Sequence, residues 1–236
     1  MRTPLRIDTM KKIQRKIRSF VRREGRLTPG QQRALTELWP LYGIELSDQP
    51  LVFNTIFGNN HPVTLEIGFG NGESLVTMAA AAPERNFLGI EVHRPGVGNM
   101  LIQSQRQELS NIRVMREDAV DILSTMIPDQ SLDCVQIFFP DPWHKKRHNK
   151  RRLIQTEFMH LLARKQPIAA TLHFATDWQD YAEHTIEIIE HDQNYRQVTA
   201  ATDYHRRPAF RPETKFERRG QKLGHKIWDI IYQRDA

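Results

Sequence analysis

The amino-acid sequence predicts an α/β fold with a doubly wound, mostly parallel seven-stranded sheet and a basic N-terminal arm. The chain has 236 residues, of which 39% are hydrophobic, enough for the core of one domain. Short, nearly continuous apolar runs alternate with helical patterns from residue 63 onward, which is typical of a parallel sheet covered on both faces. We therefore divide the chain into an arm with its connecting segment, residues 1–50, and a main domain, residues 51–236.

The arm and connecting segment come before this alternation. Residues 1–35 lack a sustained apolar stripe, and Thr28-Pro29-Gly30 is a turn signal. A helix is expected from Gln31 to Leu38, ended by the Trp39-Pro40 pair. The sequence from there to Pro62 is expected to be connecting chain.

The main domain contains an ordered series of strands and helices. Strands are expected at Val63–Ile67, Asn86–Glu91, Ile112–Arg116, Leu132–Phe139 and Ile168–Ala175, and helices at Glu73–Ala82, Val97–Leu109, Ala119–Met126, Arg151–Lys165 and Trp178–Glu190. Two more strands are expected near Tyr195–Ala200 and Lys226–Tyr232. Ligands of a doubly wound sheet bind beyond the carboxyl ends of its strands, so the residues directly after each strand are the candidates for a site.

Lysine and arginine residues are concentrated in three clusters, and the formal net charge of the chain is +6. Eleven of them lie between Arg2 and Arg33, six lie in Lys145–Arg152, and the third cluster runs from Arg206 to Lys226. One such cluster alone fits a solvated face. Three clusters around a nearly neutral middle favour a surface that binds the phosphates of a nucleic acid.

The single cysteine, Cys134, indicates the compartment. One thiol cannot form an internal disulfide, and its apolar surroundings in the sequence favour a small buried residue over a reactive one. No stretch has the length and hydropathy needed to span a bilayer, and the first ten residues do not form a secretory signal. We expect a cytoplasmic protein that makes no contact with a membrane.

A glycine-rich turn, Gly68–Gly72, follows the first strand. Glycines at alternate positions allow a ligand to approach the backbone closely, and the next helix turns its N-terminal amides toward that ligand. The dinucleotide pattern G-x-G-x-x-G would require glycine where Glu73 or Leu75 stands. The pattern found here, G-x-G-x-G after the acidic Glu66, resembles motif I of the class I methyltransferases. This resemblance implies a Rossmann-like fold and S-adenosylmethionine, whose sulfonium and ammonium groups suit acidic neighbours.

Acidic residues at three successive strand ends agree with one ligand. Glu91, roughly 20 residues beyond the turn, is suitably placed to bind both ribose hydroxyls. Asp118 follows the third strand and can accept from an adenine amino group, although it can also cap the next helix. We predict that Glu66, Gly68, Glu91 and Asp118 bind the cofactor.

The fourth strand leads into a segment, Phe138–Arg152, that is dense in functional side chains. Prolines on both sides of Asp141 restrict its backbone, Trp143 can stack on a base, and the basic run can bind phosphates. Structural roles also exist, since Asp141 can cap a turn and Trp143 can belong to the core. The density of unlike functional side chains at one strand end favours the functional interpretation.

This segment resembles the signature of the tRNA (guanine-N7-)-methyltransferases. The segments Arg18–Thr28, Phe174–Trp178 and Thr214–Glu217 are similar to segments of that family, in the same order and over nearly the whole chain. The resemblance implies transfer of a methyl group from S-adenosylmethionine to N7 of a guanosine in the variable loop of tRNA.

The resemblance also implies individual roles and partners. Asp141 would be the catalytic residue and would also contact the cofactor. The substrate-binding residues would be Lys145, Asp177, Thr214, Lys215, Phe216 and Glu217, and the RNA-binding residues would be Arg147, Lys150, Arg151 and Arg152. It implies tRNA as the partner, no obligatory protein partner, and a monomer or homodimer.

Other functions stay open at this point. An NAD-dependent oxidoreductase disagrees with Glu73 and Leu75, a non-catalytic RNA-binding protein has no need for the acidic residues, and a protein or small-molecule acceptor has less need for the basic clusters. His144 and His148 are spaced like helical zinc ligands, but the neighbouring lysines repel a cation. We therefore predict no metal site.

Overall fold

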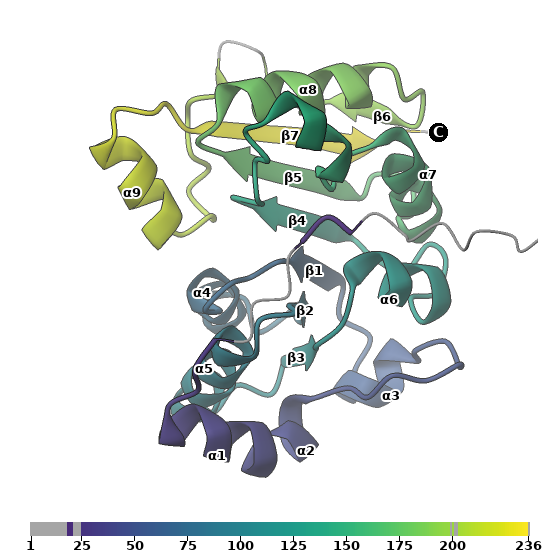
Figure 1. Cartoon of the computed structure of the whole chain (residues 1–236). Helices are drawn as coiled ribbons and strands as arrows, with labels where there is room; N and C mark the ends of the chain where they lie inside the picture. The colour runs from purple at the N-terminus through teal and green to yellow at the C-terminus, as the bar shows by residue number, and fades with distance from the viewer. Residues whose placement is uncertain (1–17, 21–24, 199, 201–202, 236) are drawn as a thin grey trace, which may run out of the picture.

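The computed structural model describes residues 18–20, 25–198, 200 and 203–235. A seven-stranded sheet with the order β3-β2-β1-β4-β5-β7-β6 forms its centre (Figure 1). The strands are β1 Val63–Ile67, β2 Asn86–Ile90, β3 Ile112–Met115, β4 Cys134–Phe138, β5 Thr171–Thr176, β6 Tyr195–Gln197 and β7 Trp228–Arg234. Strands β1 to β5 are parallel, and β7 is antiparallel to both of its neighbours. The predicted doubly wound, mostly parallel sheet is confirmed.

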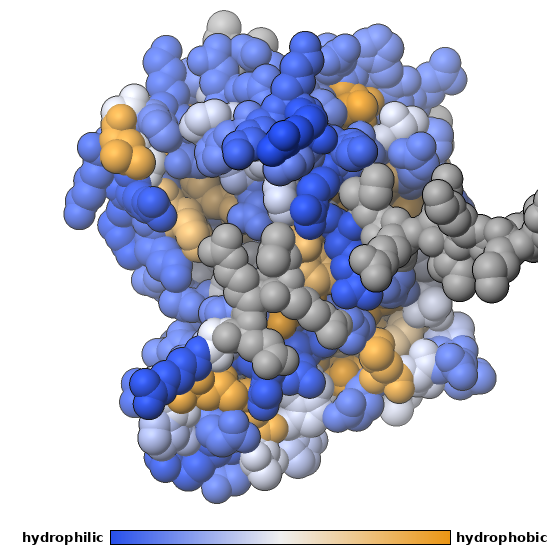
Figure 2. All heavy atoms as spheres, viewed as in Figure 1, coloured by the Kyte–Doolittle hydropathy of each residue, from blue (hydrophilic) through white to orange (hydrophobic). Residues whose placement is uncertain are grey.

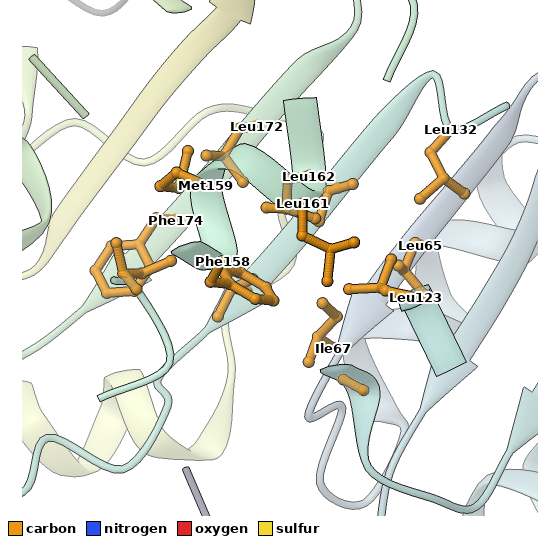
Figure 3. Packing of buried hydrophobic residues seen from close by; sticks show 14 of the residues in the cluster. Leu65, Ile67, Leu123, Leu132, Phe158, Met159, Leu161, Leu162, Leu172 and Phe174 are labelled. Carbon is orange, nitrogen blue, oxygen red and sulfur yellow. The ribbon is translucent and has the colours of Figure 1, made fainter. Parts of the chain in front are cut away.

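Helices cover both faces of the sheet. They are α1 Pro29–Glu37, α2 Trp39–Tyr42, α3 Phe53–Phe57, α4 Glu73–Ala81, α5 Arg94–Arg106, α6 Ala119–Thr125, α7 Thr156–Lys165, α8 Gln179–Glu190 and α9 Lys215–Lys222, with a 3-10 helix η1 at Lys146–Arg151. One core cluster joins the sheet to α6, α7 and α8, and a second joins it to α1, α2, α4 and α5. The close view in Figure 3 shows the first cluster, where Leu161 and Leu162 of α7 lie near Leu65 of β1.

The apolar strands are buried because both faces are covered. Every residue of β1 and of β2 is buried, as expected for parallel strands between two helical layers. Alternation along β1 sends Leu65 and Ile67 into the layer of α6 and α7. Glu66 points to the opposite face, and a carboxylate is thereby buried beside the glycine turn.

Helix α1 packs onto the main domain. Thr28 and Gln31 form a capping box at its start, with Pro29 in the first turn, which explains why the turn signal in the sequence begins a helix. A Cβ on Gly98 of α5 would meet the backbone oxygen of Gln31 at 3.1 Å, so this glycine permits the close contact. Residues 29–43 share a core with the sheet, and the division at residue 50 stays a prediction.

Several predicted boundaries are wrong. The predicted end of the first helix is confirmed, because α1 ends at Glu37 with Leu38 as its C-cap, but the chain after it is not all connecting sequence. Pro40 stands in the first turn of the next helix, α2, where a proline costs no hydrogen bond. The helix expected from Arg151 begins at Thr156, since Arg152 has an extended backbone. Strand β5 begins at Thr171 instead of Ile168, after a left-handed Ala169. Helices α2, α3 and α9 were not predicted.

Gly96→Ala should destabilise the fold by at least about 2 kcal/mol, because its Cβ would lie 1.9 Å from the carbonyl oxygen of Gly70. Gly30→Ala is the matched control, since its Cβ would meet no atom closer than 4.0 Å and alanine is the better helix former. Urea unfolding of the two variants measures the difference. Equal stabilities would contradict the close approach of α5 to the glycine turn.

Candidate active site

A cavity of about 210 Å³ lies at the carboxyl edge of the sheet. Its wall includes residues after β1, β2, β3 and β4, among them Gly68, Gly70, Glu91, Glu117 and Asp141. The strand order reverses between β1 and β4, and this is the position at which doubly wound sheets bind ligands. The structure therefore brings residues from four strand ends into one site.

The glycine turn after β1 is left-handed. Gly68 and Gly70 have φ angles of 76° and 60°, values that other residues rarely adopt. The amide of Gly70 donates to Oε2 of Glu91 at 2.9 Å, which connects the ends of β1 and β2. The backbone conformation explains why glycine is needed here.

Three backbone amides hold the carboxylate of Glu91. Besides Gly70, the amides of Val92 and His93 donate to Oε1 at 2.7 and 2.9 Å. Two carboxylate oxygens can accept about four hydrogen bonds, so the bound carboxylate retains capacity for a hydroxyl donor. The geometry leaves room for one hydroxyl donor, and the predicted contact of Glu91 with both ribose hydroxyls stays a prediction.

Glu66 is buried beside the turn with one oxygen unsatisfied. Ser74 donates to Oε1 at 2.7 Å, whereas Oε2 has no hydrogen-bond partner among the described residues. Burial raises the pKa of Glu66 to about 7, against the lowering by the Ser74 hydrogen bond, and the charge of Glu91 raises it further. A buried, unsatisfied carboxylate oxygen suits a cationic donor, so the residues present fit an ammonium-bearing cofactor.

The two acidic residues after β3, Glu117 and Asp118, border different hollows. Asp118 accepts from the amide of Val120 at 3.0 Å and caps α6, and it borders a neighbouring hollow instead of the main cavity. The adjacent residue, Glu117, borders the main cavity and was not among the predicted site residues. Glu117 could have been predicted from its place at the same strand end as Asp118. The predicted contact between Asp118 and the adenine stays a prediction.

Asp141 stands in a segment of unusual backbone conformation. Phe139 and Trp143, on either side of the Pro140–Pro142 segment, have φ angles of 50° and 51°, which are rare for bulky side chains. The amide of Phe139 donates to the carbonyl oxygen of Ala175 at 2.7 Å and fixes where the segment leaves the sheet. Strained backbone of this kind is concentrated at functional sites, and here it holds the exposed Asp141 at the cavity wall.

Trp143 and Arg151 bind the described part of the arm. The indole of Trp143 donates to the carbonyl oxygen of Ser19 at 3.0 Å, and Arg151 donates to the carbonyl oxygen of Arg18 at 3.2 Å. The guanidinium carbon of Arg151 lies 3.9 Å from the centre of the Trp143 ring. One face of the ring predicted to stack on a base is therefore covered, and the residues 21–24 of the arm signature lie outside the described residues.

The basic run does not act as one surface. Arg147 and Lys150 are exposed, as a phosphate contact requires. Arg152 is 2% exposed, donates to the carbonyl oxygen of Pro142 at 3.1 Å, and forms an ion pair with Asp180. The prediction that Arg152 contacts RNA is inconsistent with this placement, because its guanidinium is bound inside the protein.

Helix α9 brings part of the predicted substrate-binding segment to the cavity. Lys215 and Phe216 are exposed, and Phe216 borders the cavity opposite Gly70. Thr214 instead caps α9 by accepting from the amide of Glu217 at 3.1 Å, and Glu217 is buried. The side chain of Glu217 does not reach the cavity in this structure, which its predicted substrate contact would require.

The two remaining candidates lie on either side of this helix. Lys145 is exposed at the start of η1. Asp177 follows β5, and its Oδ2 lies 3.4 Å from Nδ1 of His225, a residue just after the end of α9. A Cβ on Gly220 of α9 would stand 2.7 Å from Asp177, so the helix packs closely on this residue. Asp177 thus supports α9, and its substrate contact stays a prediction.

The described part of the chain contains neither a metal-binding group of side chains nor a membrane-spanning helix. No group of three or more His, Cys, Asp or Glu side chains there is arranged to bind a metal ion. No helix there is long and apolar enough to cross a membrane.

Comparison with known proteins defines the class of the chain as a methyltransferase. A family model described as a putative methyltransferase matches residues 60–230. The fold is shared with the crystal structure of the 16S rRNA methyltransferase KamB, with a TM-score of 0.55 and 12% identity over 78% of this chain and 93% of that one. The structure of TrmN from Thermus thermophilus gives a TM-score of 0.52 over 86% of this chain and 48% of that chain.

Within that class the chain belongs to the tRNA (guanine-N(7)-)-methyltransferase family. It is 56% identical over 220 residues to the tRNA (guanine-N(7)-)-methyltransferase of Klebsiella pneumoniae, covering 93% of this chain and 92% of the relative. The enzyme of the same description from Sodalis glossinidius is 56% identical over 225 residues, covering 95% and 94%. The sequence resemblance is thereby confirmed.

Glu66→Gln should change how stability depends on pH. The carboxyl has a pKa of 4.5 when unfolded and about 7 when folded, so the folded protein holds the extra proton between these values. Raising the pH through this window therefore destabilises the wild type, by about 3 kcal/mol at most. Gln keeps the Ser74 contact without titrating, so its stability relative to the wild type should rise with pH. Urea unfolding across the window measures this, and a constant difference would exclude the shift.

Proposed function

We propose that this protein transfers a methyl group from S-adenosylmethionine to N7 of a guanosine in the variable loop of tRNA. The observation that carries the proposal is that Asp141, on its strained segment, shares one cavity with Gly68 and Glu91. The membership of the family supports the same reaction. An NAD-dependent oxidoreductase is disfavoured because Glu73 and Leu75 stand where the dinucleotide pattern requires glycine, and because Glu66 and Glu73 would repel a pyrophosphate.

The chemistry determines what the protein must supply. Guanine N7 carries a lone pair and no proton at neutral pH, so its methylation requires no general base at that atom. The reaction requires an aligned approach of N7 to the methyl carbon, and the product ring gains positive charge. We assign both tasks to Asp141, which orients the base edge and stabilises that charge.

S-adenosylmethionine supplies an electrophilic methyl group when it is bound. Glu66 and Glu91 would hold its ammonium and ribose groups, and Gly68 would let it approach the backbone. Glu117 or Asp118 would accept from the adenine amino group at the end of β3. Phe139 and Phe216 border the cavity and would exclude water from the reacting groups.

The RNA would lie on the hydrophilic surface around the cavity. In the view of Figure 2, hydrophilic residues cover most of the surface that is not drawn in grey, with hydrophobic residues in separate patches. Guanine N7 lies in the deep, narrow groove of A-form RNA, so the target guanosine must come from a loop or leave its stack. Arg147, Lys150 and Lys145 would bind the flanking phosphates. We further propose that the protein acts in the cytoplasm without an obligatory protein partner, as a monomer or homodimer.

The decisive experiment is incubation of the purified protein with bulk tRNA and labelled S-adenosylmethionine. N7-methylguanosine should be the labelled nucleoside after digestion. Titration with S-adenosylhomocysteine separates the alternatives, because a non-catalytic RNA-binding protein would bind tRNA without binding this nucleoside. A labelled protein or small molecule with unlabelled tRNA would show a different acceptor.

Asp141→Asn should lower kcat by on the order of 100-fold while changing the affinity for S-adenosylhomocysteine little, because the product charge loses its counter-charge. Single-turnover methylation of tRNA measures the rate of the chemical step. Asp180→Asn is not a suitable control, since Asp180 holds Arg152, whereas Asp121→Asn on α6 changes a carboxylate that does not border the cavity. Full kcat in Asp141→Asn would refute the assigned role.

The double variant Arg147→Gln/Lys150→Gln should weaken tRNA binding and reduce the slope of log Kd against log salt by about two, one for each lost phosphate contact. Arg106→Gln is the matched control, because Arg106 is exposed at the end of α5, at the opposite edge of the sheet. Arg152→Gln should instead lower the free energy of unfolding. Filter binding over a salt series tests this, and unchanged slopes would exclude the contacts.

A further inference from the structure

A buried charged network lies behind the cavity and has no part in the reaction described so far. Its centre is Arg211, whose side chain is 0% exposed. Nε and Nη2 of Arg211 donate to the two carboxylate oxygens of Asp229 on β7, at 2.6 and 2.7 Å. Nη1 donates to Oε2 of Glu217 on α9 at 2.7 Å. One guanidinium therefore joins the sheet to α9.

The positive and negative charges of the network are balanced. Arg207, which is partly exposed, lies 3.5 Å from the other oxygen of Glu217, so two carboxylates face two guanidinium groups. Burial alone would raise the pKa of Asp229, but the hydrogen bonds from His173 and Arg211 outweigh it, and the pKa lies below its usual value. Each buried carboxylate needs its arginine, since a lone buried charge is costly.

Glu217 places its neighbour Phe216 on the cavity. The two residues stand in the first turn of α9, with Glu217 directed inward and Phe216 42% exposed. A Cβ on Gly70 would lie 3.6 Å from the ring of Phe216, so the ring lies over the glycine turn. The position of the Phe216 ring therefore depends on the contact between Glu217 and Arg211, which holds the first turn of α9 in place.

The same guanidinium lies against the strand end that leads to Asp141. Its central carbon is 5.7 Å from the ring centres of both Phe138 and Phe139. The register of the sheet aligns Phe138 with Ala175 and Ala175 with Asp229, so these three side chains point to one face. Arg211 thus contacts both walls that enclose the reacting groups.

We infer that Arg211 and Glu217 are positioning residues that hold the first turn of α9, and with it Phe216, against the glycine turn. Glu217 acts through Arg211 from inside the protein and does not touch the substrate. The inference rests on the proposed function only for the identity of the RNA substrate that meets Phe216. The far end of α9 has separate support, because Gly220 packs on Asp177.

Glu217→Gln is the main variant, because glutamine keeps the shape and one acceptor oxygen while removing the charge. Glu213→Gln is the matched control, since Glu213 pairs with Arg207 and Arg218 at the surface, at 3.9 and 3.5 Å. Glu217→Gln should increase amide exchange in the first turn of α9 by about tenfold and lower kcat/KM for tRNA by about tenfold. Arg211→Lys, which keeps the buried charge but not the bidentate contact, should give an intermediate loss of both.

A double-mutant cycle with Phe216→Ala separates positioning from direct contact. If Glu217 acts through Phe216, then Glu217→Gln should lower kcat/KM by less than about twofold once Phe216 has been removed. Additive losses in the cycle, together with unchanged exchange in α9, would show that Glu217 contacts the substrate and would overturn the inference.

Failure of the proposed function would look different. A wild-type protein that does not methylate tRNA would refute the reaction, whereas amide exchange in α9 would still report the anchor. The same cycle measured on the affinity for S-adenosylhomocysteine would still report the placement of Phe216. Unchanged exchange in both Glu217→Gln and Arg211→Lys would overturn the inference whatever the reaction is.

Discussion

The site depends on the left-handed backbone at Gly70. Its amide binds Glu91, its carbonyl oxygen lies where a side chain on Gly96 would stand, and Phe216 lies over its missing side chain. The end of β1, the end of β2, the start of α5 and the first turn of α9 therefore meet at one residue. A Cβ at this position would add backbone strain and crowd the ring above it.

The main effect of the network around Arg211 is to fix the orientation of α9, and its contribution to stability is small. Removing two carboxylates and a guanidinium from water costs about as much as their attraction returns, so an apolar replacement could be equally stable. An apolar cluster would hold α9 against the sheet without fixing the rotation of the helix about its own axis. The bidentate contact with Asp229 and the contact with Glu217 fix the direction from which Phe216 meets the glycine turn.

The sequence predicted the strands well because burial on both faces makes each one a short apolar run. It also predicted that Glu66, Glu91 and Asp141 lie at strand ends, where the structure has them. The sequence does not show which of two environments, surface or interior, a given side chain occupies. Arg152 and Arg147 are alike in the sequence, but the backbone at Arg152 turns its side chain inward to Pro142 and Asp180. The same holds for Glu217, whose partner Arg211 comes from a segment with no periodic pattern. Helix α9 is too polar to show an apolar stripe.

The contacts of the acidic residues also explain how an acidic cofactor site can coexist with a phosphate-binding surface in one small domain. The negative charge of four buried carboxylates near the cavity is compensated locally. Burial raises the pKa of Glu66 to about 7, three amides bind Glu91, and Arg211 pairs with Asp229 and Glu217. Asp141 is the exposed carboxylate at the cavity, beside the cations of η1. A phosphate that approaches Arg147 and Lys150 therefore meets a positive surface, while a purine that gains positive charge meets Asp141.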